Sequence, residues 1–227
     1  MSLRYYNPQL INAIRYRFPG AETLAKTYSQ AGQDLFVLGL LNGKRHGTYV
    51  EIGIQYPELI SNTVVLERDF GWTGISLDIV ADCVDEFHKV RNNAAYVQDA
   101  TTANYAQLLL DAGITATDLD YASVDCEPAA QTLKALKQLP LDTHRFAIIT
   151  FEHDYYNAGP EVQAQSREYL LSKGYELMVS NISALNQTHS FEDWWAHPEL
   201  TDPAARDLFR SNGADVKDWE RYAYPNL

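Results

Sequence analysis

Acidic side chains follow four predicted strands of this sequence, each at the point where the strand ends. They are Asp78, Asp99, the pair Asp125 and Glu127, and the group Glu152, His153 and Asp154. The carboxyl ends of parallel strands meet at one edge of a sheet, and ligands bind outside that edge. Any single acid is more simply explained as a turn or capping residue, since Asp is common in turns. Four strand ends in succession favour a binding site.

Two kinds of chemistry are open to this group. His153 is a candidate general base, although a neighbouring acid raises the pKa of a histidine and favours its charged form. The alternative is a hydrogen-bonded histidine at a strand end. Asp125, Glu127 and Asp154 offer the oxygen ligands that Mg²⁺ prefers, so a magnesium site is a second use of the same cluster. Asp125 and Glu127 also face the first loop, within reach of an amino group or an acceptor.

Residues 48–79 are the element that must position these acids. An apolar run from Thr48 to Ile52 predicts a buried strand that ends at Gly53, and Ser61 to Thr63 lead into a helix. Gly74 to Asp78 predicts a second buried strand ending in an acid. Strand, glycine turn, helix, strand and acid are the plan of a nucleotide-binding βαβ unit, in which Asp78 would accept the ribose hydroxyls. With one glycine in the loop, a plain βαβ packing unit is the alternative.

The rest of the chain continues the alternation of strands and helices. Further strands are predicted over residues 95–98, 121–125, 146–151 and 175–182, and helices around 84–90, 105–112, 128–136 and 161–173. This order predicts an α/β, Rossmann-like fold with a mostly parallel sheet covered by helices on both faces. We expect one domain over 1–227. It comprises a helical N-terminal segment (1–45), with a helix beginning at Asn7-Pro8, a core (46–184) and an aromatic-rich extension (185–227).

The aromatic side chains of the extension allow two interpretations. Trp194, Trp195 and Trp219 lie there, with Tyr222 and Tyr224. Aromatic residues in such a position usually pack an edge hairpin. Otherwise they wall an acceptor pocket or form a contact between two copies of the chain, so a homodimer is a possible partner state.

Composition narrows the class of partner. Thirty acidic residues against eighteen basic ones give a net charge of −12, which disfavours a nucleic-acid substrate because a phosphate backbone would be repelled. Two cysteines without ligand spacing predict neither a disulfide framework nor a zinc site. The N-terminus lacks the apolar core of a signal peptide, and the longest apolar run, Leu35 to Leu41, is too short to span a bilayer. We therefore expect a cytoplasmic protein with no membrane partner.

A succession of short motifs resembles the FkbM family of class I S-adenosylmethionine-dependent methyltransferases. The motifs are Ser29-Gln30-Ala31-Gly32-Gln33-Asp34, Tyr49-Val50-Glu51-Ile52-Gly53, Ser61-Asn62-Thr63 through Leu66-Glu67, Gly71-Trp72-Thr73-Gly74-Ile75, Ser123-Val124-Asp125-Cys126-Glu127 and Glu152-His153. The resemblance implies a seven-stranded sheet with a reversed hairpin at its edge. It also implies S-adenosylmethionine lying across the ends of the first strands, and a hydroxyl on a small polar acceptor such as a sugar or natural product.

The strand-end positions and this resemblance together give two sets of expected site residues. Cofactor contacts are expected from Glu51, Gly53, Ser61, Asn62, Asp78, Asp99 and Asp125. Acceptor chemistry is expected from His153, Asp125 and Glu127.

The sequence departs from the family at four positions. Glu51 stands where the family usually has Asp, and Pro57 stands where a second glycine normally follows, which stiffens the loop and removes an N–H donor. Pro128 and Ala130 replace a glycine and an acid after the fourth strand. These changes keep open an alternative function, a methyltransferase-like binding or scaffold protein without catalysis. A nicotinamide-dependent oxidoreductase is disfavoured because the G-x-G-x-x-G fingerprint is absent.

Overall fold

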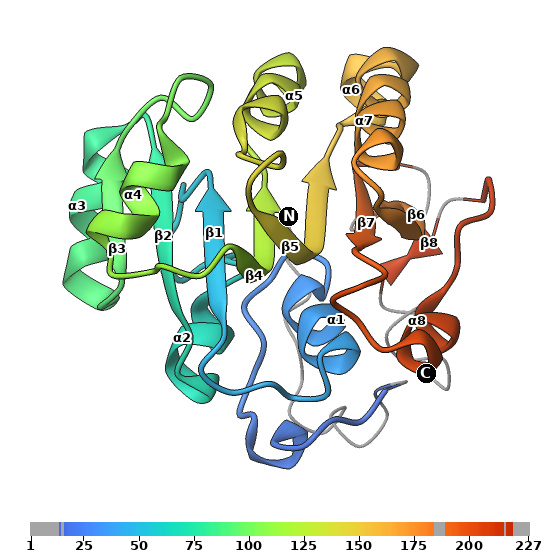
Figure 1. Cartoon of the computed structure of the whole chain (residues 1–227), viewed down its shortest axis with the longest axis horizontal. Coiled ribbons are helices and arrows are strands. Elements are labelled where there is room, and N and C mark those ends of the chain that lie inside the picture. Colours follow the sequence, from blue (N-terminus) through green and yellow to red (C-terminus); the bar gives the residue numbers. More distant parts are fainter. Residues whose placement is uncertain (1–13, 15, 184–188, 216, 220–227) are drawn as a thin grey trace.

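A mixed sheet of eight strands forms the middle layer of the molecule (Figure 1), in the order β3-β2-β1-β4-β5-β7-β6-β8. The computed structural model describes residues 14, 16–183, 189–215 and 217–219. The strands are β1 (Thr48–Ile52), β2 (Thr73–Asp78), β3 (Ala94–Val97), β4 (Asp118–Val124), β5 (Arg145–Glu152), β6 (Glu176–Ser183), β7 (Glu192–Ala196) and β8 (Lys217–Asp218). The helices are α1 (Gln33–Leu40), α2 (Val64–Phe70), α3 (Ala81–Val90), α4 (Tyr105–Asp111), α5 (Ala129–Gln138), α6 (Tyr155–Ala158), α7 (Pro160–Ser172) and α8 (Pro203–Phe209), with a short 3₁₀ turn at Ala21–Thr23.

The predicted α/β, mostly parallel sheet is confirmed, with one change in the strand count. Strands β1 to β5 pair in parallel, and β7 runs antiparallel between β5 and β6. The sheet has eight strands rather than seven because Lys217–Asp218 adds a two-residue strand beside β6. Residues 185–227 therefore contribute β7 to the body of the sheet, between strands of the expected core.

Both faces of the sheet are covered by apolar helices. On one face, side chains of α1, α2 and α8 pack on Tyr49, Tyr121, Ile148 and Trp194. On the other face, side chains of α4, α5 and α7 pack on the remaining positions of the same strands. Alternate residues of each strand point to opposite faces, so the near-continuous apolar runs of β1, β4 and β5 fit a sheet that is buried on both sides.

The aromatic residues of the C-terminal part are packing residues where the structure describes them. Trp194 and Trp195 are fully buried, and Trp194 stacks on Phe36 of α1 with ring centroids 4.6 Å apart. Trp219 is also buried, above the backbone of Gly32. The predicted helix after Asn7-Pro8 and the side chains of Tyr222 and Tyr224 lie outside the described residues.

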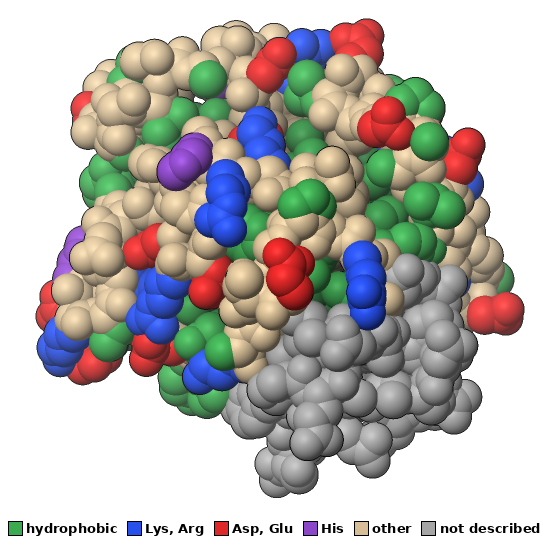
Figure 2. Space-filling view, turned by 90° about the horizontal axis from the view of Figure 1, so that it is seen from below, with side chains coloured by type: hydrophobic (Ala, Val, Ile, Leu, Met, Phe, Trp, Pro, Cys, Tyr) green, Lys and Arg blue, Asp and Glu red, His purple; other side chains and the backbone are tan. Residues whose placement is uncertain are grey.

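The amino ends of the strands carry paired charges. Lys44 contacts Asp120 at 2.6 Å, and Arg145 contacts Asp118 at 2.7 Å. Figure 2 shows this end of the molecule, where basic and acidic side chains are interspersed rather than gathered by sign. Among the described residues, no helix has the length and apolar character needed to cross a membrane.

Candidate functional site

The carboxyl ends of β1, β2, β4 and β5 meet at one edge of the sheet, at the top of Figure 1. The strand order reverses between β1, which leads outward to β2 and β3, and β4, which leads the other way to β5. Such a switch point is where open α/β sheets bind ligands. The predicted site residues lie around it, and each has a defined set of neighbours.

The backbone conformation at position 53, and its close contact with the loop after β4, require a glycine there. Its φ of 87° lies in the left-handed region, and a Cβ atom there would stand 1.7 Å from the carbonyl oxygen of Asp125. The Gly53 N–H donates to Leu77 O at 2.9 Å, and the Asp125 N–H donates to Ile52 O at 3.1 Å. The loops after β1 and β4 therefore touch at this point. Gly53 was predicted to contact the cofactor, and the structure shows its close approach to the loop after β4.

Asp78 fixes the loop after β1 from the end of β2. Its Oδ2 accepts the N–H groups of Ile54 and Gln55, each at 3.0 Å, and its Oδ1 accepts the N–H of Val80 at 2.8 Å. A carboxylate offers about four lone-pair positions, so capacity for one ribose hydroxyl is left. The next two residues, Ile79 and Val80, are exposed apolar side chains. They form a surface on which a flat ring could lie, and the sequence analysis did not anticipate them.

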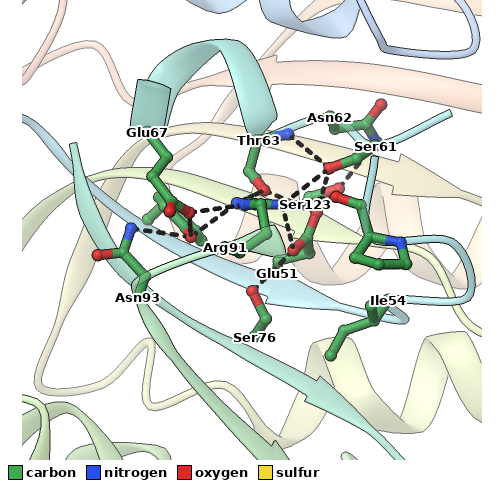
Figure 3. A network of polar contacts seen from close by, with 12 residues as sticks. Glu51, Ile54, Ser61, Asn62, Thr63, Glu67, Ser76, Arg91, Asn93 and Ser123 are labelled. Atoms are coloured by element: carbon green, nitrogen blue, oxygen red, sulfur yellow. Dashed lines mark hydrogen bonds and ion pairs between the residues drawn. The ribbon is translucent and has the colours of Figure 1, made fainter. Parts of the chain in front are cut away.

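Glu51 is buried and fully engaged (Figure 3). Its Oε1 accepts hydrogen bonds from Ser61 Oγ at 3.1 Å and Thr63 Oγ1 at 2.7 Å, and its Oε2 accepts from Ser76 Oγ at 2.7 Å. Arg91 Nη1 lies 3.9 Å from Oε2. The carboxylate was expected to contact the cofactor. In the structure it holds the start of α2 and the middle of β2 in place, and Ser61 is one of its donors.

Asn62 has an unmet hydrogen-bonding group. Its Nδ2 donates to Ser123 Oγ of β4 at 2.9 Å, whereas its buried Oδ1 has no partner. Buried polar groups are almost always hydrogen-bonded, so an exception points to a missing water or ligand. The acceptor lies just before α2, beside the switch point. S-adenosylmethionine carries an ammonium group, two ribose hydroxyls and an adenine amino group, the kinds of donor that acceptors such as Asn62 Oδ1 and the spare lone pair of Asp78 can take.

Asp99 lies apart from these groups. It is exposed at the end of β3, and its Oδ1 accepts from the N–H and the hydroxyl of Thr101 at 2.8 and 2.7 Å. These hydrogen bonds lower the pKa of Asp99. This arrangement is that of a turn residue, the simpler interpretation given above.

Four acids meet where β4 and β5 end. Oxygen atoms of Glu127, Glu152 and Asp154 all lie within 4.8 Å of one another, and Asp125 shares a hydrogen bond with Glu152. Burial and the charge of Glu127 raise the pKa of Asp154 to about 7. Burial and the charge of Asp125 raise the pKa of Glu152 well above its usual range. Protons or a cation must therefore balance this cluster near neutral pH. The predicted magnesium set is changed by one residue, since Glu152 takes the place of Asp125.

His153 is turned away from this cluster and is fully buried. Its Nδ1 accepts the N–H of Tyr155 at 3.1 Å, and its Nε2 lies 3.0 Å from Gln163 Nε2 and 3.5 Å from Asp193 Oδ1. Burial alone would raise the pKa of Asp193, but hydrogen bonds from His153 and Arg167 lower it to about 2. With both ring nitrogens in contact with protein groups, the geometry favours the alternative interpretation, a hydrogen-bonded histidine at a strand end.

Two further charged residues were missed by the sequence analysis. Arg91 is buried directly after α3 and reaches Glu51, Glu67 and Tyr49. Glu192 is buried on β7, where its Oε2 accepts from Trp194 Nε1 at 2.6 Å and Gln33 Nε2 at 2.8 Å. An available clue was Glu51 in the middle of an apolar strand, because a buried carboxylate needs a partner. The identity of that partner depends on folding.

Comparison with solved structures identifies proteins that have a similar fold. A candidate rRNA-methylase from Clostridium thermocellum is 12% identical with a TM-score of 0.51, over 73% of this chain and 92% of its own. TrmK of M. capricolum, in complex with S-adenosyl-homocysteine, is 9% identical with a TM-score of 0.51, over 73% of this chain and 67% of its own. The N-methyltransferase NodS from Bradyrhizobium japonicum WM9 is 12% identical with a TM-score of 0.50, over 74% of this chain and 94% of its own.

At these identities the likeness establishes the fold, the Rossmann-like fold of class I S-adenosylmethionine-dependent methyltransferases. No protein-family model matches the sequence, and no curated protein matches it.

Proposed function

We propose that this chain is an S-adenosylmethionine-dependent methyltransferase that acts on a hydroxyl group of a small polar acceptor. The observation that carries the proposal is Asn62 Oδ1, a buried acceptor without a partner beside the switch point. Fold alone does not define function, so this site feature is needed in addition to the sheet order. The resemblance of the strand-end motifs to the FkbM family supports a sugar or natural-product hydroxyl as the acceptor.

Some residues at this edge of the sheet would bind the cofactor, and others would accept the proton of the acceptor. Asp78 would take a ribose hydroxyl, and Ile79 with Val80 would cover the adenine. Bound S-adenosylmethionine supplies an activated methyl group, so the protein must mainly align the acceptor and accept its proton. Glu127 and Asp154 would serve as the proton acceptor, because they stand at the same edge, whereas both ring nitrogens of His153 contact protein groups. A magnesium ion bound between these carboxylates stays a prediction. The proposed binding partner of the protein is the small polar molecule that accepts the methyl group.

Titration calorimetry with S-adenosylhomocysteine, with NAD as the comparison ligand, tests the proposal. We expect binding of S-adenosylhomocysteine and none of NAD. Asn62→Ala should weaken binding by about tenfold, the loss expected for one hydrogen bond to a charged group. Gln107→Ala, on the exposed side of α4, is the matched control and should bind as the wild type does. A folded wild type that binds no S-adenosylhomocysteine at millimolar concentration would contradict the proposal.

A second candidate, a binding or scaffold protein without catalysis, is favoured by one observation. Three backbone N–H groups already occupy Asp78, and Pro57 stiffens the loop that contains two of them, those of Ile54 and Gln55. Transfer of a labelled methyl group to a panel of monosaccharides and hydroxylated small molecules separates the two functions. Cofactor binding with turnover of at least one acceptor supports the enzyme. Addition and chelation of Mg²⁺ in the same assay tests the predicted ion.

A further inference from the structure

Arg91 is the most heavily bonded side chain near the proposed cofactor edge. Its guanidinium is fully buried behind the loop after β1 (Figure 3). Nε donates to Glu67 Oε2 at 2.7 Å, and Nη2 donates to Tyr49 OH and Thr63 Oγ1, each at 2.9 Å. Nη1 donates to the Pro57 carbonyl at 3.1 Å and to Ser61 Oγ at 3.3 Å. One side chain thus joins α3, α2, β1 and the loop between β1 and α2.

The charged groups of this network, two carboxylates and one guanidinium, are paired with one another. Glu51 and Glu67 are both buried, and Arg91 is the cation between them. A buried carboxylate is costly unless it is paired and hydrogen-bonded. Arg91 provides five planar donors, whereas a lysine provides a point charge with three. The fork geometry is therefore needed to reach Glu67 on one side and the Pro57 carbonyl on the other.

The loop after β1 is held from two directions. Asp78 binds the N–H groups of Ile54 and Gln55 at its beginning, and Arg91 binds the carbonyl of Pro57 and the hydroxyl of Ser61 further along. Proline lacks an N–H but keeps its carbonyl, so the unusual Pro57 still provides the acceptor that Arg91 uses. Asn62 follows Ser61 directly, so the orientation of the Asn62 side chain depends on the hydrogen bonds from Arg91 to Pro57 and Ser61. The same loop forms one wall of an open groove of about 380 Å³ against α3.

We propose that Arg91 is a positioning residue that sets the conformation of residues 54–63 and thereby the binding of the cofactor. It acts through Pro57, Ser61 and Thr63, because its own side chain has no exposed surface from which to touch a ligand. This inference rests on the proposed function for its ligand. The conformation of the loop can be tested independently of that function.

The test compares Arg91→Met and Arg91→Lys with Arg145→Met as a control away from the loop. Arg145 is a partly exposed arginine at the start of β5, at the opposite end of the sheet, and its Nη2 donates to Asp118 Oδ2 at 2.7 Å. Amide hydrogen exchange of Ile54 and Gln55 reports on the loop in the absence of ligand, and the amides of Ala122 and Ile149 report on the sheet. Binding of S-adenosylhomocysteine is measured by calorimetry, and the KM for S-adenosylmethionine and kcat are measured separately.

We expect Arg91→Met to keep the exchange of Ala122 and Ile149 slow while Ile54 and Gln55 exchange faster. Affinity for S-adenosylhomocysteine should fall by about tenfold, with the loss appearing in KM more than in kcat. Arg91→Lys should restore part of the affinity, and Arg145→Met should stay within about twofold of the wild type.

Three outcomes decide the question. Unchanged loop exchange together with unchanged affinity, in a folded Arg91→Met protein, would overturn the inference. If Arg91→Met does not fold, the same criteria apply to Arg91→Lys, which keeps the charge and loses the fork. If the wild type binds no S-adenosylhomocysteine, the proposed function fails. Loop exchange then still decides whether Arg91 positions residues 54–63.

Discussion

At the scale of single residues, the edge of the sheet is shaped by close contacts between its own loops. Gly53 lies against the Asp125 carbonyl, and Asp78 binds the backbone just beyond Gly53. Several residues that the sequence pattern assigns to a ligand therefore serve first to fix the loops. Asn62 Oδ1 and one lone pair of Asp78 keep spare hydrogen-bonding capacity that a cofactor could use.

Gly53→Ala tests the loop contact. The added methyl group would overlap the Asp125 carbonyl, and the backbone would keep its φ of 87°. We expect the free energy of unfolding to fall by roughly 3 kcal/mol or more. Gly113→Ala is the control, because φ there is 78° but no atom lies within 4 Å of an added Cβ. Its loss should be about 1–2 kcal/mol. Equal losses in urea unfolding would show that the contact with Asp125 has no cost.

His153→Ala tests whether the buried histidine is structural. Removing the imidazole takes hydrogen-bond partners from Tyr155 N, Gln163 and Asp193 and leaves a cavity. The free energy of unfolding should fall by about 2–4 kcal/mol. Turnover per folded molecule should change by less than about threefold, because other carboxyl groups would accept the proton. A loss of about 10² or more in kcat, in protein shown to be folded, would restore His153 as the base.

At the scale of elements, the helices and strands that could be predicted from the sequence were those whose boundaries are marked by local residue signals. The limits of β1 and β2 and the start of α2 were predicted closely, because Gly53, Gly74 and Asp78 mark the strand limits and Ser61 to Thr63 precede the helix. The four-residue α6 and the two-residue β8 were not predicted, since such short elements carry no periodic pattern. Glu51 was predicted at the right strand position, but its role depends on Arg91, which lies far away in the sequence and meets it only in the folded sheet.

The start of α8 is a local feature that should behave independently of the site. Asp202 Oδ1 accepts the N–H of Ala205 at 2.9 Å, and Pro203 occupies the first helical position. Asp202→Ala should lower the free energy of unfolding by about 1 kcal/mol. Asp207→Ala, exposed within the same helix, should change it by less than about 0.5 kcal/mol. S-adenosylhomocysteine affinity should be the same in both variants; a change confined to Asp202→Ala would link α8 to the site.

At the scale of the whole molecule, buried and partly buried acids line three neighbouring strands. Glu152 of β5 pairs directly with Glu192 of β7, and Asp125 follows the last paired residue of β4 on the other side of β5. Burial raises the pKa of Glu192 to about 8, against the opposing hydrogen bond from Trp194. Because the net charge of the chain is −12, protons held at this edge reduce the electrostatic repulsion within the folded protein.

These raised pKa values predict that the protein is less stable at pH 8.5 than at pH 5.5. An acid whose pKa is higher in the folded than in the unfolded chain binds more protons when folded, so the free energy of unfolding falls as pH rises between the two values. For Glu192 this window runs from its ordinary value of 4.5 to about 8. Urea unfolding across this range measures the slope. Glu192→Gln, which cannot ionise, should make the slope shallower, whereas Glu86→Gln on the exposed side of α3 should leave it unchanged. A stability that rises with pH through this window would mean that Glu192 is ionised in the folded protein, with its charge balanced by a cation at the edge of the sheet.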